Sequence, residues 1–211
     1  MLQCTRVAKR LRSTHNLSVQ LPPDRLQFVM SQEGPTKPEY IVPSAGKRGM
    51  TALHHAAYQN DPIAVRAELR RGLPVDARDD GGWTPLHWSI DMAQAWGEPE
   101  QVVSQLLKAG ASPNSMDNDG FSVLMMACGR NNDAILEKLI ASGADINLRS
   151  AETTPLHEAA GCNFKKGIQR LLIHGADPRQ TNSRGITPEQ VALECGFDES
   201  AAVLGSVRPA I

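Results

Sequence analysis

Three histidines recur at one position of a repeated pattern, and histidine is the side chain that most often binds metals. His54, His87 and His157 each stand three residues after a threonine. Zinc ligands must lie about 2 Å from one shared ion, whereas equivalent side chains on successive packed helices are about 9 Å apart. We therefore expect the histidines to have a structural role, and we expect no metal site.

The other groups that could do chemistry match no catalytic or ion-binding motif. The sequence holds no C-x-x-C pair, phosphate-binding loop, nucleophile elbow or H-E-x-x-H run. The carboxylate pairs Asp79–Asp80 and Asp117–Asp119 could suit calcium, but the remaining ligands of an EF-hand are missing. These observations favour a protein that is not an enzyme and has no cofactor or small-molecule substrate. An enzyme built on the same scaffold stays the alternative.

Composition excludes several classes of protein. The 211 residues carry 22 Lys and Arg against 23 Asp and Glu, a net charge of −1, whereas a dedicated nucleic-acid-binding protein is clearly basic. No apolar run approaches the roughly 20 residues of a transmembrane helix, so no membrane partner is expected. There are four cysteines and no secretory signal pattern, which favours a cytoplasmic location.

A repeat must position these residues. Five similar segments, TALHHAA, TPLHWSI, SVLMMAC, TPLHEAA and TPEQVAL, start at residues 51, 84, 122, 154 and 187. Successive starts are therefore 33, 38, 32 and 33 residues apart. A second series, Gly72, Gly110, Gly143 and Gly175, keeps the same phase. The chain thus contains five units of about 33 residues, with an insertion of about five in the second unit.

Each unit predicts two short helices. Thr84 can cap the first helix, and Pro85 suits its first turn, where an N–H group would be unpaired anyway. Apolar pairs one turn apart, such as Val102–Val103 and Leu106–Leu107, predict the second helix. The glycines of the second series stand where a helix ends in a left-handed residue. Neither helix can bury its apolar stripe alone, so the units must stack.

These motifs resemble those of the ankyrin-repeat family. The likeness rests on TPLH at 84–87 and 154–157, SGADIN at 142–147, HGAD at 174–177 and the 33-residue period. It implies an all-α solenoid of helix-turn-helix units with short β-hairpin tips, and histidines that brace the hairpins by hydrogen bonds. It also implies that the chain binds another protein through the tips and the inner helices. The expected units are 47–80, 81–118, 119–150, 151–182 and 183–207, between an N-terminal extension (1–46) and a tail (208–211).

Aromatic residues gather in the second unit and indicate a candidate binding surface. Trp83 occupies the expected tip position whose counterparts are Met50, Phe121, Thr153 and Ile186, a mostly large and apolar set. An exposed apolar strip usually marks an interface. Trp88 could instead pack between helices, and Trp96 could anchor the insertion. The predicted partner-binding residues are Lys47, Arg48, Met50, Asp80, Trp83, Trp88, Trp96, Asn118, Asp119 and Phe121.

The N-terminal extension leaves two interpretations open. Residues 1–46 carry a net charge of +3 and no acidic residue before Asp24, whereas residues 47–211 carry −4. The segment could cap the first unit, or it could be an arm with a targeting or docking signal, including an organellar one. The expected function is non-catalytic protein binding by a chain that is monomeric alone. An adaptor, a bacterial effector acting in host cytosol and a toxin-immunity inhibitor all fit.

Overall fold

The structure, a computed structural model, describes residues 49–91 and 99–206, and these contain ten α-helices. The predicted extension, the residues Lys47, Arg48 and Trp96, and the C-terminal tail lie outside the described residues. The helices form consecutive pairs: α2 (Ala52–Tyr58) with α3 (Pro62–Arg70), α4 (Pro85–Asp91) with α5 (Pro99–Lys108), α6 (Val123–Gly129) with α7 (Asp133–Ala141), α8 (Pro155–Gly161) with α9 (Lys165–Ile173), and α10 (Pro188–Glu194) with α11 (Asp198–Gly205).

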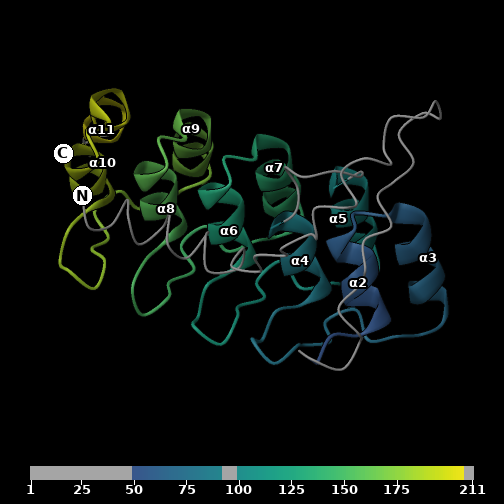
Figure 1. Cartoon of the computed structure of the whole chain (residues 1–211). Coiled ribbons are helices and arrows are strands. Elements are labelled where there is room, and N and C mark those ends of the chain that lie inside the picture. Colours follow the sequence, from purple (N-terminus) through teal and green to yellow (C-terminus); the bar gives the residue numbers. More distant parts are fainter. Residues whose placement is uncertain (1–48, 92–98, 207–211) are drawn as a thin grey trace, which may run out of the picture.

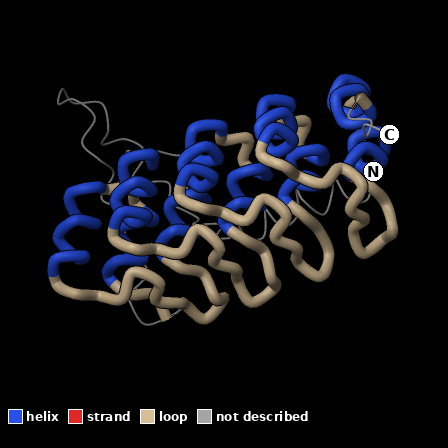
Figure 2. The backbone as a smooth tube through the Cα atoms, turned by 180° about the vertical axis from the view of Figure 1, so that it is seen from behind, coloured by secondary structure: helices blue, strands red, loops and turns tan. Residues whose placement is uncertain are grey.

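The pairs stack side by side in chain order (Figure 1). The first helices of the pairs, which we call the inner helices, contact one another in sequence from α2 to α10, and the second, or outer, helices do the same from α3 to α11. The long loops that lead from one pair to the next project from one side of the stack (Figure 2). The fold is therefore the all-α solenoid that the repeat predicts.

Capping residues start the inner helices as expected. The side chains of Thr51, Ser122, Thr154 and Thr187 each accept a hydrogen bond from the backbone N–H group three residues later. Such a bond satisfies a donor that a helix terminus leaves unpaired. The four glycines of the second series follow the outer helices with φ between 77° and 94°, the left-handed conformation predicted for them.

A continuous apolar core runs through the five pairs. Small residues on the inner helices, among them Ala57 and Ala160, are fully buried and allow close helix packing. The outer helices contribute larger residues such as Val103, Ile135 and Leu171, which are also fully buried. Each pair thus completes the core of its neighbours, and stability must be shared along the stack.

Asparagine side chains also join successive repeats. Asn114 Oδ1 accepts a hydrogen bond from the N–H group of Asp145 at 2.7 Å, and Asn147 Oδ1 accepts one from Asp177 at 2.9 Å. Asn147 Nδ2 donates to the Gly175 carbonyl at 3.0 Å. These bonds fix the spacing of the loops on the side where the outer helices end.

The tips are hydrogen-bonded turns rather than full β-hairpins. The N–H group of Asp79 donates to the Trp83 carbonyl at 2.9 Å, and that of Asp117 donates to Phe121 at 3.0 Å. In the described residues, pairing of the strand type is limited to one isolated bridge between Met116 and Ser122. The turns are too short for a ladder, because the next inner helix begins at once.

Candidate functional site

Two of the three repeated histidines, His54 and His157, connect their inner helix to the tip that follows it. The backbone N–H of Thr51 donates to His54 Nδ1 at 3.0 Å, and His54 Nε2 lies 3.0 Å from the Trp83 carbonyl. His157 repeats the second contact with the Ile186 carbonyl, also at 3.0 Å. An Nδ1 that accepts leaves the ring proton on Nε2, which donates to the carbonyl. The bracing hydrogen bond that the resemblance implies is present for His54 and His157, whereas the Nε2 of the buried His87 has no hydrogen-bond partner among the described residues.

Burial keeps these imidazoles neutral. It lowers the pKa of His54 and His157 below the ordinary value of 6.5, although each ring's carbonyl partner opposes the shift. For His87, whose ring faces the Phe121 carbonyl, burial lowers the pKa to about 4. The bracing contacts of His54 and His157 are therefore uncharged hydrogen bonds near neutral pH.

Polar residues of the predicted surface lie exposed at the second and third tips. Asp80, Asn118 and Asp119 are all exposed. Asn118 joins the two tips, since its N–H group donates to the Gly81 carbonyl and its Nδ2 donates to the Asp80 carbonyl, each at 3.0 Å. The structure thus brings Asp80 and Asn118 together in one fixed arrangement.

The apolar tip residues are less open than the sequence indicates. Met50, Trp83, Phe121 and Ile186 are half-buried and pack against the core, and Thr153 is buried. The prediction of an exposed apolar strip therefore needs a correction. The four partly buried side chains pack against the core, so only part of the surface of each one faces solvent.

Trp83 and Trp88 form one aromatic cluster with Tyr58. The ring centroids of Trp83 and Trp88 are 4.9 Å apart, and those of Tyr58 and Trp88 are 5.5 Å apart in a T-shaped arrangement with an interplanar angle of 74°. Trp88 is the central ring and is only 8% exposed, whereas Trp83 and Tyr58 are half-buried. Most of the surface available to a partner at this cluster therefore belongs to the two outer rings.

Asp79 fixes both tryptophans. Its Oδ1 accepts hydrogen bonds from the N–H groups of Gly81 and Trp83 at 2.9 and 2.8 Å. Its Oδ2 accepts one from the indole Nε1 of Trp88 at 2.9 Å. The Asp79 carboxylate, which the sequence offers only as one of a pair of neighbouring acidic residues, is thus the centre of a hydrogen-bond network.

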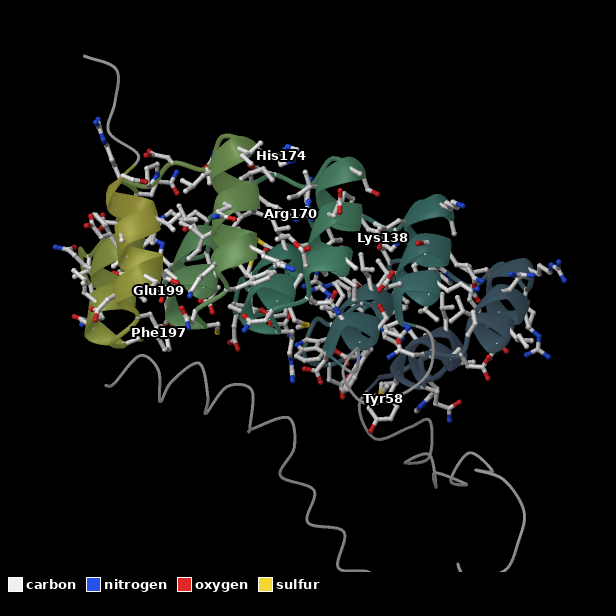
Figure 3. The ribbon with its side chains drawn as sticks, turned by 90° about the horizontal axis from the view of Figure 1, so that it is seen from above. Tyr58, Lys138, Arg170, His174, Phe197 and Glu199 are labelled. Atoms are coloured by element: carbon white, nitrogen blue, oxygen red, sulfur yellow. The ribbon has the colours of Figure 1, made fainter. Side chains whose placement is uncertain are left out.

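Sequence reasoning missed Tyr58 as a candidate residue. It is the last residue of α2 and extends from the side of the stack opposite Lys138, Arg170 and His174 of the outer helices (Figure 3). The available signal was its register: Tyr58 follows Thr51 by seven residues, as Asp91 follows Thr84. Residues at this register end the inner helices.

Sequence reasoning also missed a nearly buried ion pair at the ends of two inner helices. Arg130, which caps α6, pairs with Asp91 at the end of α4, and the two side chains are 13% and 4% exposed. The pair joins the second and third inner helices. Breaking such a pair leaves an unpaired buried charge, which costs far more than a surface ion pair contributes.

Two thiols near this region are held in the protonated form. Burial raises the pKa of Cys128 well above its ordinary value and that of Cys162 to about 12, and the nearby Glu158 carboxylate raises both further. A thiol that stays protonated is a poor nucleophile, because the thiolate is the reactive species. The environment therefore disfavours a nucleophilic role for either residue.

We expect both thiols to resist alkylation in the folded protein. At pH 8 the thiolate fraction of Cys162 should be roughly a thousandfold below that of an ordinary thiol, since its pKa is about 12 rather than 9.0. Peptide mapping by mass spectrometry after a pulse of iodoacetamide, with and without urea, measures this protection. Equal labelling of Cys128 and Cys162 in the two conditions would contradict it.

Metal-binding groups and membrane-spanning helices are both absent from the described residues. Among these residues, no group of three or more His, Cys, Asp or Glu side chains could hold a metal ion. None of the described helices is both long enough and apolar enough to span a bilayer. The features that remain are the tips and the ends of the inner helices.

Comparison with known proteins agrees with this architecture. The model of the family described as "Ankyrin repeats (3 copies)" matches residues 27–117, 91–182 and 124–205. The chain belongs to the ankyrin-repeat family. In ankyrin-repeat proteins the stack generally serves as a protein-protein interaction module.

Similar ankyrin-repeat segments occur in proteins with quite different names. The chain is 33% identical over 156 residues to human SH3 and multiple ankyrin repeat domains protein 2, with 74% of the chain and 8% of the relative covered. It is 34% identical over 149 residues to bovine mitochondrial disaggregase, covering 68% and 21%. It is 30% identical over 192 residues to mouse ankyrin repeat and SOCS box protein 16, covering 71% and 42%. Less than half of each relative is matched, so the likeness concerns the repeats and not the relatives' other activities.

Proposed function

We propose that this ankyrin-repeat chain binds one partner protein, without catalysis, through the tips of its first three repeats and the adjoining ends of the inner helices. The observation that supports this most is the arrangement of Trp83 beside exposed polar groups at two linked tips. Asp80 and Asn118 are held together by the hydrogen bond between the tips. The proposed surface thus combines a large aromatic side chain with fixed polar neighbours, which is the usual composition of an interface centre.

Rigidity supports the same proposal. The carbonyl of Trp83 contacts His54, its N–H group donates to Asp79, and its ring packs on Trp88. A surface that is already ordered loses little conformational entropy when a partner binds. Exposed charged residues of these tips, among them Arg78, Asp80 and Asp119, would contribute more to orientation and association rate than to affinity.

The test is a comparison of two tip variants in capture from native lysate. Trp83→Ala should weaken binding of the captured partner by about 2 kcal/mol, roughly thirtyfold in Kd, because it removes the aromatic anchor. Ile186→Ala changes the equivalent tip position of the last repeat, outside the proposed surface, and should leave affinity unchanged. Thermal melts must show that both variants fold. If Trp83→Ala and the parent chain bind the partner with equal affinity, the proposed binding surface is wrong.

A further inference from the structure

The first described repeat has a side that no described helix covers. Ala52, the first residue of α2, is exposed, whereas the first residues of the other four inner helices are buried. Ala67, five residues before the glycine that follows α3, is also exposed, whereas the residues at this position of α5, α7 and α9 are half-buried. The counterparts of the two alanines are Pro85, Val123, Pro155 and Pro188, and Gln105, Lys138 and Arg170. Two apolar side chains thus face solvent at positions that are covered where another repeat precedes.

Contacts between outer helices show which residues cover this position. Arg170, five residues before Gly175, donates from Nη2 to Asp133 Oδ2 of the preceding outer helix at 3.0 Å. Its Nη1 lies 3.3 Å from Glu137 Oε2. Asp133 and Glu137 are ten and six residues before Gly143. The residue five before the glycine of one outer helix therefore contacts the residues ten and six before the glycine of the helix that precedes it.

A segment with the spacing of an outer helix precedes the described residues. Residues 24–34 begin with an aspartate and end in Gly34, the same ten-residue interval that α7 has between its first aspartate and Gly143. Leu26 and Met30 are eight and four residues before Gly34, where α7 has fully buried apolar residues. These counterparts are Ile135 and Leu139. Phe28 is six residues before Gly34, the position that contacts the following outer helix.

The family model and the length of the connection support this register. The first match of the ankyrin-repeat model begins at residue 27, inside the segment. Gly34 is followed by Thr51 after 17 residues, whereas the equivalent interval in the later repeats is 11 or 12, so the chain is long enough to return to α2. Gln27 and Ser31 are polar where α7 has apolar residues. A helix at the end of a stack has a neighbour on one side only, so fewer of its positions need to be apolar.

We propose that residues 24–34, which lie outside the described part of the chain, form an outer helix that packs on α3 as α7 packs on α9, with Phe28 against Ala67. An apolar pair then takes the place of the ion pair between Glu137 and Arg170. The large ring faces a small side chain, and both lose apolar surface to solvent. The segment therefore belongs to the stack and is not a free arm.

The exposure of Ile63 agrees with this register. Ile63 is nine residues before Gly72, and Lys166 is nine residues before Gly175. Lys166 is exposed although α7 precedes its helix. A helix on the uncovered side of α3 therefore covers Ala67 and leaves Ile63 in solvent.

Hydrogen–deuterium exchange of the full chain, measured by mass spectrometry on peptides from residues 24–34 and from α3, tests the contact. Both regions should be protected in the parent chain. Phe28→Glu should speed exchange in both about tenfold, because it places a charge against an apolar side chain. Val29→Glu is the matched control, since Val29 is five residues before Gly34 and faces away from α3. It should leave exchange in α3 unchanged.

A double variant tests whether the two residues are in direct contact. Ala67→Arg alone should also speed exchange of residues 24–34. Phe28→Glu combined with Ala67→Arg recreates the charges of Glu137 and Arg170, and should exchange about threefold more slowly than either single variant, the effect of a surface ion pair. Exchange in the double variant as fast as in the single variants would refute the contact.

Three other results would overturn the proposal. Residues 24–34 of the parent chain exchanging as fast as an unfolded peptide would show that the segment is an arm. Equal effects of Phe28→Glu and Val29→Glu on α3 would show that the register is wrong. Protection of α3 that rises with protein concentration, while residues 24–34 exchange freely, would place a second copy of the chain on this side. None of these results alters the expectation for Trp83→Ala, because Trp83 lies in the second tip.

Discussion

Replacing Ile135 by alanine should lower the free energy of unfolding by about 2–5 kcal/mol, because it removes a large side chain from the middle of the shared core. Ile135 is 0% exposed in α7 of the central repeat. The surrounding helices belong to both neighbouring repeats, since α7 contacts α5 and α9 as well as α6. A cavity at this position therefore weakens the coupling of both halves of the stack. Urea denaturation followed by helical circular dichroism measures the loss.

Ile63→Ala is the matched control for this prediction. The chemical change is the same and the residue also lies on an outer helix, but Ile63 is 80% exposed in α3. Its truncation opens no cavity, so stability should change by no more than about 0.5 kcal/mol. Similar losses in the two variants, or no loss for Ile135→Ala, would mean that the core is not continuous through the third repeat.

Much of the fold was predictable because each repeat obeys local rules. A threonine or serine cap starts the inner helices, and Gly110 or Gly143 ends an outer helix, whatever lies further along the chain. The period then requires the units to stack, because a single helix pair cannot bury its apolar side. The five inner helices follow from these two facts.

The candidate site was less predictable because its geometry depends on contacts between repeats. The sequence offers Asp79 only as one of a pair of acidic residues, and only the packing of α4 against the tip brings Trp88 within hydrogen-bond distance of it. Arg130 and Asp91 are 39 positions apart, and neither belongs to the repeated motif. The repeat specifies where a tip lies but leaves the side chains on it unconstrained, so the degree of exposure of Trp83 emerged only from the packed structure.

Acidification should destabilise the protein, with His87 making a large contribution. In the unfolded chain the imidazole has its ordinary pKa of 6.5, whereas burial lowers the pKa of folded His87 to about 4. Between these values the unfolded state binds more protons, so the free energy of unfolding falls as pH falls. His87 alone should cost about 3 kcal/mol by pH 4, at 1.36 kcal/mol for each unit of pKa difference. Above pH 6.5 it should have no effect on the pH dependence.

The chain itself supplies the variant that isolates this contribution. In the last repeat Gln190 replaces the histidine, and its Oε1 accepts a hydrogen bond from the Thr187 N–H group at 2.8 Å, as His87 Nδ1 does from Thr84 at 3.1 Å. His87→Gln should therefore keep the cap but titrate no longer. Urea unfolding at pH 7 and near pH 4 should show a shallower loss of stability than in the parent chain, by about 3 kcal/mol. Parallel pH profiles of His87→Gln and the parent chain would show that the buried imidazole does not govern acid stability.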